Sequence, residues 1–444
     1  MKRKIVLIRR HEPLHEGWST RSFSPAAAHL ESNVKVAGAY FDERFPPVRL
    51  VGRFPADGSP SLQPPAVMVV PGMRENVASA YIVRASVEDE NAVARLVHDR
   101  DDEVLGVFAD VPIGPVPTCG NDPAVGSASD VRAKLDVQAL RTAGCTGRGT
   151  RTVIVDSGVN DSVIPVAGGW SPIAPGAPGY LAPGAVRPPS GDWRHHGTMC
   201  AFDARIAAPD TAIYDYRLLT GTQASFGALL SDAITAFGEL FAFLQANPGP
   251  LVVNNSWCLF NRGDDEPTGS PQNYGANLNH PFNQIVATLV AAGADVLFAA
   301  GNCGADCPDG RCGPGDVGTG NSIHGASAHP DVLTVAALTV NDERLGYSSQ
   351  GPGGIAMMKP DLAGYSHFAG SGVFPADSGT SAACPVVAGV VAALRERLAP
   401  NQITPPQLKA LLQRTARDLG GVGFDYDYGH GAVNPPGALA MLGF

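Results

Sequence analysis

The amino-acid sequence predicts an α/β protein: a doubly wound, mostly parallel sheet with helices on both faces, preceded by a small α/β domain. Three observations lead to this fold class. The chain has 444 residues, which is long for one domain. Short apolar runs alternate with helix-like stretches through residues 133–444, as they do in parallel α/β sheets. A separate strand–helix–strand pattern ends near residue 109.

The small first domain is assigned to residues 1–118. Its opening residues have no clear periodicity, and the Pro- and Ser-rich stretch 56–72 predicts a loop. Apolar runs predict strands over 80–85 and 104–109. Between them, apolar residues at helical spacing predict a helix over 87–98.

An exposed linker is predicted between the two domains, over residues 119–132. The surrounding stretch 111–130 is rich in Pro, Gly and Ser, which favour turns and loops. Exposed loops are preferred sites of proteolytic nicking. Self-cleavage of the chain is therefore expected to fall within this stretch.

The large domain, residues 133–444, is predicted to begin with a helix over 136–142. A long Gly- and Pro-rich loop is expected over 165–191. The remaining elements alternate in the order of a parallel sheet: strands over 152–155, 213–216, 251–255, 296–300 and 332–338, and helices that begin at residue 196 and span 227–245, 282–292 and 386–398.

Three polar motifs lie at the ends of these core elements. An Asp-Ser-Gly motif begins at Asp156, directly after an apolar strand, and open α/β sheets place their active sites at such carboxyl ends. A His-Gly-Thr motif begins at His196, at the predicted start of a helix. Ser381 lies in a Gly-Thr-Ser-Ala-Ala-Cys-Pro segment before a buried helix. Nucleophilic acyl transfer needs this set of a serine, a base and a carboxylate.

A fourth motif, Ala-Gly-Asn, ends at Asn302 after the strand 296–300. The Asn302 amide is suited to donate a hydrogen bond to the oxyanion of a tetrahedral intermediate. The backbone N–H of Ser381, at a helix start, is the expected second donor.

Together, the four motifs resemble those of the subtilisin-like serine peptidases (subtilases), over residues 135–444. The resemblance implies the subtilisin-like fold and a serine endopeptidase that needs no cofactor for catalysis. It makes Ser381 the nucleophile, His196 the general base and then acid, Asp156 the orienting carboxylate and Asn302 part of the oxyanion hole. The related sedolisin type uses Glu and Asp in place of the histidine, and the His196 motif argues against it.

The first domain resembles the latter half of a subtilase propeptide, a small ferredoxin-like domain. In that family the domain assists folding, and its tail inhibits the enzyme by lying in the active-site cleft. The alternative is an accessory domain that is never removed.

The resemblance also implies that substrate binds as an added β-strand. One wall of the primary specificity pocket is expected at Ser256, Trp257 and Cys258. The opposite substrate-binding strand is expected at Ser225, Phe226 and Gly227. Family members usually have Gly at the position of Cys258, so a narrower pocket is expected here.

The composition limits the partners. A net charge of −10 and a pI of about 5.5 disfavour nucleic acid and anionic membranes. No apolar run approaches the ~18 residues of a membrane span. The basic start carries four apolar residues, fewer than the roughly 7–15 of a signal peptide. We therefore expect a cytoplasmic protein, or one exported by another route, that acts on a protein or peptide substrate.

The eight cysteines fall into three groups. Cys200, Cys258 and Cys384 are expected to be buried, reduced thiols. Because zinc prefers four ligands, the cluster after Asn302 favours free thiols or a local disulfide over a metal site. That cluster consists of Cys303, Cys307 and Cys312, and a second candidate pair is Cys119 with Cys145.

The sequence does not decide whether the chain binds calcium or what its biological role is. The family often binds structural calcium, for which Asp306, Asp309 and Asp316 are candidate ligands. The alternatives to a general endopeptidase are a dedicated intracellular processing peptidase with one substrate and an inactive binding scaffold of the same fold. The complete set of motif residues favours an enzyme.

Overall fold

The structure of the chain is a computed structural model. It describes residues 2–10, 36–42, 44–45, 47–50, 79–98, 104–115, 122–173, 175–176, 180–185, 195–220 and 227–444.

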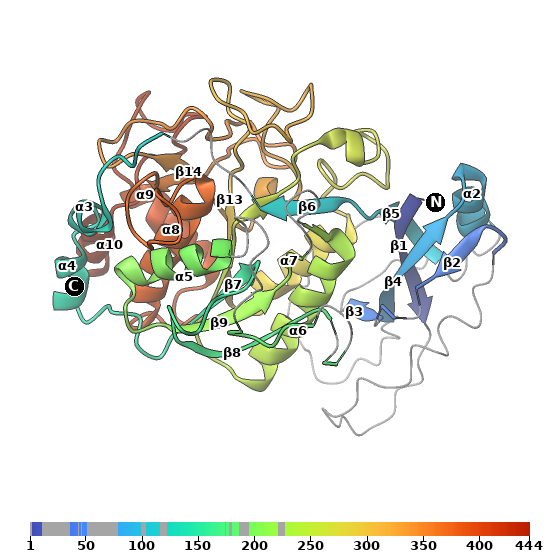
Figure 1. The fold of residues 1–444 in the computed structure, drawn as a ribbon, viewed down its shortest axis with the longest axis horizontal. Coiled ribbons are helices and arrows are strands. Elements are labelled where there is room, and N and C mark those ends of the chain that lie inside the picture. The colour runs from blue at the N-terminus through green and yellow to red at the C-terminus, as the bar shows by residue number, and fades with distance from the viewer. Residues whose placement is uncertain are drawn as a thin grey trace.

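The centre of the molecule is a seven-stranded parallel sheet (Figure 1). Its strands are buried apolar runs, as expected when helices cover both faces of a sheet. Their order across the sheet is β15 (Leu362–Tyr365), β14 (Leu333–Leu338), β13 (Ala294–Ala299), β11 (Leu251–Asn255), β7 (Arg151–Asp156), β9 (Ala212–Arg217) and β8 (Val166–Trp170). The predicted doubly wound α/β fold is confirmed.

Helices pack on both faces of this sheet. One face carries α5 (His196–Ala207) and α8 (Thr380–Arg395), and the other carries α6 (Leu230–Ala246) and α7 (Pro281–Ala291). Alternate strand residues supply two separate cores. In β13, Leu297 faces the α8 core, whereas Phe298 faces the core of α6 and α7.

Short helices complete the large domain. They are α3 (Ala128–Lys134), α4 (Val137–Thr142), α9 (Pro405–Thr415) and α10 (Pro435–Leu442), with 3-10 turns η2 (Arg262–Asp264) and η3 (Gly325–Ala328). Residue Ser127 caps α3 through a capping box with Asp130, which satisfies backbone N–H groups at the helix start.

Two edge strands of the sheet were not predicted from the sequence. β8 lies inside the predicted loop 165–191, because its Val-Ala-Gly-Gly-Trp sequence lacks an apolar run. β15 is only four residues long and follows a Pro-rich turn. Both strands are defined by pairing with a neighbour, which a local sequence pattern does not reveal.

The N-terminal region forms an antiparallel sheet with α2 (Glu90–His98) packed against it. The strand pattern expected near 80–109 appears as β4 (Ser79–Val87) and β5 (Val104–Ala109). Between them lies β1 (Lys2–Arg10), which the sequence analysis did not identify. Two short strands, β2 (Ala39–Phe41) and β3 (Val48–Leu50), pair with β4.

The chain leaves this sheet through β6 (Pro112–Pro115), which joins the large domain. β6 pairs antiparallel with β10 (Ala228–Leu229) on one side and with β12 (Trp257–Cys258) on the other. In Figure 1, β6 runs from β5 into the body of the large domain. The Pro- and Gly-rich stretch therefore contains a paired strand where the composition predicted a loop. The domain limits at residues 118 and 133 stay a prediction.

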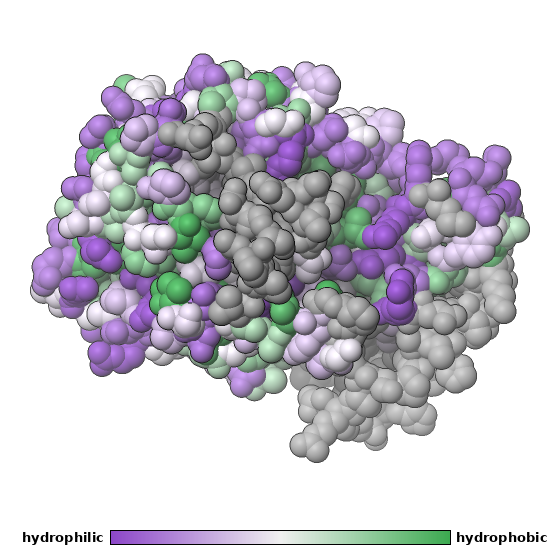
Figure 2. All heavy atoms as spheres, viewed as in Figure 1, coloured by the Kyte–Doolittle hydropathy of each residue, from purple (hydrophilic) through white to green (hydrophobic). Residues whose placement is uncertain are grey.

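The described surface mixes polar and apolar side chains, with green residues scattered in small groups on the face shown in Figure 2. Among the described residues, none of the helices has the length and apolar character that a bilayer crossing requires.

The buried ion pair between Arg395 and Asp295 supplies a test of the fold. Arg395 ends α8 and donates two hydrogen bonds to Asp295 in β13, at 2.6 and 2.7 Å. We expect Asp295→Ala to lower the free energy of unfolding by about 3–5 kcal/mol, because it leaves a buried guanidinium without a counterion. Denaturant titration in a Ser381→Ala background measures this loss.

The matched control is Asp210→Ala, which breaks an exposed pair with Arg148 at 3.7 Å. Exposed pairs contribute about 0–1 kcal/mol, so this variant should stay close to the parent. Equal losses in the two variants would contradict the role given to the buried pair.

Candidate active site

Asp156 ends the central strand β7, at the carboxyl edge of the sheet. The strand is mostly apolar and buried, and the Asp156 side chain at its end is also shielded from solvent. The backbone N–H of Ser157 donates to the Asp156 carboxylate at 2.6 Å. This contact orients the carboxylate toward the start of α5.

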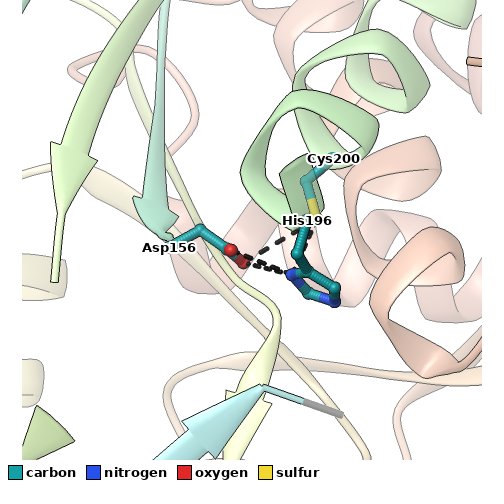
Figure 3. A group of neighbouring side chains, drawn as sticks. All are labelled: Asp156, His196 and Cys200. Carbon is teal, nitrogen blue, oxygen red and sulfur yellow. Dashed lines mark hydrogen bonds and ion pairs between the residues drawn. The ribbon is translucent and has the colours of Figure 1, made fainter. Parts of the chain in front are cut away.

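His196 is the first residue of α5, and its Nδ1 lies 2.9 Å from both carboxylate oxygens of Asp156 (Figure 3). The close approach needs Gly197, because a Cβ there would lie 2.6 Å from the carbonyl oxygen of Gly158. The Gly197 N–H also donates to the Ser157 hydroxyl at 3.0 Å. The Asp-Ser-Gly and His-Gly-Thr motifs therefore bind each other directly.

Ser381 is the second residue of α8 and is buried. Pro385, four residues later, has no N–H to bond to the Ser381 carbonyl. That carbonyl instead accepts hydrogen bonds from the Ser256 hydroxyl at 3.0 Å and the Cys200 thiol at 3.5 Å. The Ser381 hydroxyl lies 3.4 Å from the Ser256 carbonyl oxygen. The proline thus ties the nucleophile's backbone to the neighbouring elements.

Cys200 links the three predicted catalytic residues. It lies one turn after His196 on α5, and its Sγ is 3.9 Å from His196 Nδ1 and 3.8 Å from Asp156 Oδ2. Burial, followed by the negative charge of Asp156, raises the pKa of the Cys200 thiol. The thiol therefore stays protonated and donates weakly. The sequence analysis placed Cys200 in the core but did not connect it with the site, although its i+4 spacing from His196 was a usable signal.

Asn302 follows β13 and is also buried. Its Oδ1 accepts from the backbone N–H and the hydroxyl of Thr380, both at 3.0 Å. With the oxygen fixed in this way, Nδ2 is the donor end of the amide. The structure thus brings Asn302 to the residue that precedes Ser381.

Of the six residues expected to bind substrate, the structure describes four. Trp257 and Cys258 pair with Pro115 and Gly114 of β6, so this wall already carries an added strand. The Trp257 indole is buried and donates to the Val155 carbonyl at 3.0 Å. Only its backbone therefore faces the added strand.

Of the other four predicted binding residues, two are described by the structure and two are not. Ser256 is buried beneath Ser381. Gly227 pairs with Thr220 and leads directly into β10. Ser225 and Phe226 lie outside the described residues.

One group of three potential metal-binding side chains occurs among the described residues. The carboxylate of Asp156, the imidazole of His196 and the thiol of Cys200 lie within 4.8 Å of one another (Figure 3). This set coincides with the hydrogen-bonded pair described above. The three candidate calcium ligands do not converge, since each carboxylate binds an arginine: Asp306 binds Arg344, Asp309 binds Arg311, and Asp316 binds Arg262.

The cysteines after Asn302 form a local disulfide, as one of the two favoured alternatives predicted. Cys303 bonds to Cys312, and Cys307 is also disulfide-bonded. Cys145 is a free, buried thiol, so the expected Cys119–Cys145 pair is wrong. Its burial against α4 and α8 explains why it is not available to a linker cysteine. Cys119 itself lies outside the described residues.

The chain is similar in sequence to known proteins. The sequence model described as the subtilase family matches residues 153–431. The human membrane-bound transcription factor site-1 protease is 29% identical over 268 residues, which cover 56% of this chain and 22% of that protein. The chain thus spans about a fifth of that relative's length.

Two further matches cover nearly the whole of the other protein. Subtilisin of Bacillus pumilus is 25% identical over 312 residues, 68% of this chain and 95% of that one. A crystal structure of MycP1 with its N-terminal propeptide removed has a TM-score of 0.49 at 20% identity, covering 70% of this chain and 96% of that chain.

The buried thiols supply a test of the site's geometry. Burial raises the pKa of Cys200, Cys258 and Cys384, that of Cys258 to about 12. Because the thiolate is the reactive form, iodoacetamide at pH 8 should leave all three unmodified in the native protein. Peptide mapping by mass spectrometry checks this.

The control is the same treatment in guanidinium, where these thiols should react fully. Cys303 and Cys312 should react only after reduction. Rapid alkylation of Cys200 in the native chain would show that the space beside His196 is open to solvent.

Proposed function

This chain belongs to the subtilase family, and on that premise we propose that it is a serine endopeptidase acting through an acyl-enzyme on Ser381. The observation that carries the proposal is the pairing of His196 Nδ1 with Asp156 at the sheet edge where α8 presents Ser381. A buried carboxylate on Nδ1 selects the tautomer whose Nε2 accepts a proton.

In the proposed reaction, His196 removes the proton from the Ser381 hydroxyl as its oxygen bonds to the substrate carbonyl carbon. Asp156 stabilises the resulting imidazolium. The oxyanion accepts hydrogen bonds from Asn302 Nδ2 and the Ser381 N–H. His196 then protonates the leaving amine, and the peptide C–N bond breaks. His196 then removes a proton from water as the water oxygen bonds to the acyl carbon, and it returns that proton to the Ser381 oxygen as the ester C–O bond breaks. No cofactor takes part.

The proposed substrate is an extended segment of a protein or peptide. The pairing of β6 with both β10 and β12 supports this, because one extended chain already lies between these strands. Backbone hydrogen bonds on both sides hold such a chain whatever its side chains. This binding mode favours an endopeptidase over an enzyme that acts on small esters.

We also propose that the N-terminal domain acts as a propeptide-like inhibitor, because β6 occupies the substrate's position. The domain is fastened nearby by charged contacts. Asp110 accepts from the backbone N–H and hydroxyl of Ser231 at the start of α6, at 2.8 and 2.7 Å. Arg84 donates to Asp232 at 2.6 Å, and Lys4 pairs with Glu266. The endopeptidase proposal has a narrower form, a dedicated processing peptidase with one substrate. The alternative to an enzyme is an inactive binding scaffold of the same fold.

A fluorophosphonate probe tests the nucleophile and the oxyanion hole. Ser381 should be labelled in the wild-type chain, and Ser381→Ala should abolish the label. Asn302→Leu, of similar size, should lower kcat about 100- to 1,000-fold with little change in KM, because the lost donor acts mainly on the transition state. If the folded wild-type chain is labelled neither before nor after removal of the N-terminal domain, the scaffold alternative is established.

Intact mass after incubation tests the inhibitory domain. We expect wild type to lose about 110–130 N-terminal residues and then to react faster with the probe, because β6 no longer fills the cleft. Ser381→Ala should keep its full mass. A wild-type chain that stays intact yet reacts at the rate of the truncated enzyme would contradict inhibition by β6.

A further inference from the structure

Two buried carboxyl groups meet behind the active site. Asp203 lies on α5, two helical turns after His196, and Asp377 lies four residues before Ser381. Both side chains are buried, and the two carboxyl groups interact with each other. The pair therefore joins the helix that carries the proposed base to the segment that leads into the proposed nucleophile.

The hydrogen-bond partners show which carboxyl holds the proton. Asp377 accepts from both the backbone N–H and the hydroxyl of Ser371, contacts that favour its charged form. Neither oxygen of Asp203 accepts a hydrogen bond from an N–H or O–H group among the described residues. Asp203 lacks such contacts to stabilise a negative charge, so it is the carboxyl expected to retain a proton, with Asp377 as the acceptor.

The surroundings offer no positive charge to replace that proton. A Cβ at Gly370 would lie 2.4 Å from a carboxylate oxygen of Asp377, 2.8 Å from the ring of Phe368 and 3.1 Å from the ring of Phe202, the residue before Asp203. The other titratable groups facing the pair are the Cys200 thiol, one turn earlier on α5, and beyond it Asp156. Among the described residues, no lysine, arginine or histidine is an interaction partner of Asp203 or Asp377. Two ionised carboxylates here would repel each other in a buried site.

The helices α5 and α8 are in backbone contact at the same level. A Cβ at Gly389 of α8 would lie 2.1 Å from the carbonyl oxygen of Ala204, the residue after Asp203. A displacement of α5 at this point is thus transmitted directly to α8. The carboxyl pair and this contact together fix the two helix starts that carry His196 and Ser381.

We propose that Asp203 and Asp377 form a carboxyl–carboxylate pair that positions His196 and Ser381 through one shared proton. The positioning role rests on the proposed peptidase function, whereas the pair itself does not. Both are positioning residues, since neither is placed in contact with the reacting atoms.

The pair has a defined pH dependence. Burial, more than any other cause, raises the pKa of both groups, that of Asp377 to about 6 and that of Asp203 well above its ordinary value. A carboxyl whose pKa is raised by folding stabilises the folded state most at low pH. This contribution decreases as the pH rises from the unfolded pKa of about 3.9 toward the folded pKa. Acidic conditions therefore favour the pair, and alkaline conditions oppose it.

The test of the pair uses Asp203→Asn, which keeps a hydrogen-bond donor but has no proton to lose. Unfolding is measured from pH 6 to 8 in a Ser381→Ala background, so that catalysis plays no part. Relative to the Asn variant, the unfolding constant of the Asp203 parent should rise with pH, by up to about tenfold per pH unit for one linked proton. Asp210→Asn makes the same change of charge on the surface, where the side chain is 44% exposed, and should stay parallel to the parent. A parent and Asn variant with parallel pH dependence would overturn the pair.

The positioning role is tested in chains that retain Ser381, by the rate of fluorophosphonate labelling against pH. Asp203→Asn should label at neutral pH within severalfold of wild type, whereas a folded Asp203→Leu should label at least tenfold more slowly. Toward pH 10 the ratio of the Asn variant's rate to the wild-type rate should increase. A constant ratio overturns the positioning role, and this result decides the matter even where the Leu variant does not fold. A wild type that never labels, together with the predicted stability difference, would reject the peptidase function and leave the carboxyl pair in place.

Discussion

The complete burial of α8 is the constraint on which the rest of the structure depends. Every residue from Thr380 to Arg395 is buried, and the helix contacts β11, β13, β14 and β15. Its position is fixed at one end by the ion pair of Arg395 and at the other by the hydrogen bonds to the Ser381 carbonyl. A helix held in this way presents its second residue with little freedom, and the site is built around that residue.

Much of the fold followed from the sequence, because buried parallel strands and their helices are long apolar patterns. The central strands and the helices α6 and α7 were expected close to their observed bounds, whereas α8 begins at Thr380, six residues before the predicted start at 386, because the helix continues through Pro385. The edge strands β8 and β15, and the N-terminal β1, were not identified. Their formation depends on partners distant in the chain, which a local pattern does not contain.

The candidate site, like the fold, was predicted only in part from the sequence. The motifs located Asp156, His196, Asn302 and Ser381, since polar residues at the ends of apolar strands and helices are conspicuous. The supporting contacts were not foreseen. The hydrogen bond from Cys200 to the Ser381 carbonyl and the carboxyl of Asp203 close to Asp377 arise from α5 packing against α8. Residues that are far apart in sequence and individually unremarkable for chemistry meet only in the folded chain.

The strand β6, which lies between β10 and β12, shows how far apart these two strands are. Neighbouring strands lie about 4.8 Å apart, so the two walls are separated by roughly 10 Å when one extended chain fills the space. An α-helix with its side chains is about 10–12 Å across and has no backbone groups left to pair with either wall. A polypeptide entering this slot must first give up its own helical or sheet structure over several residues. Local unfolding of the target, as much as its side chains, would then determine where this chain acts.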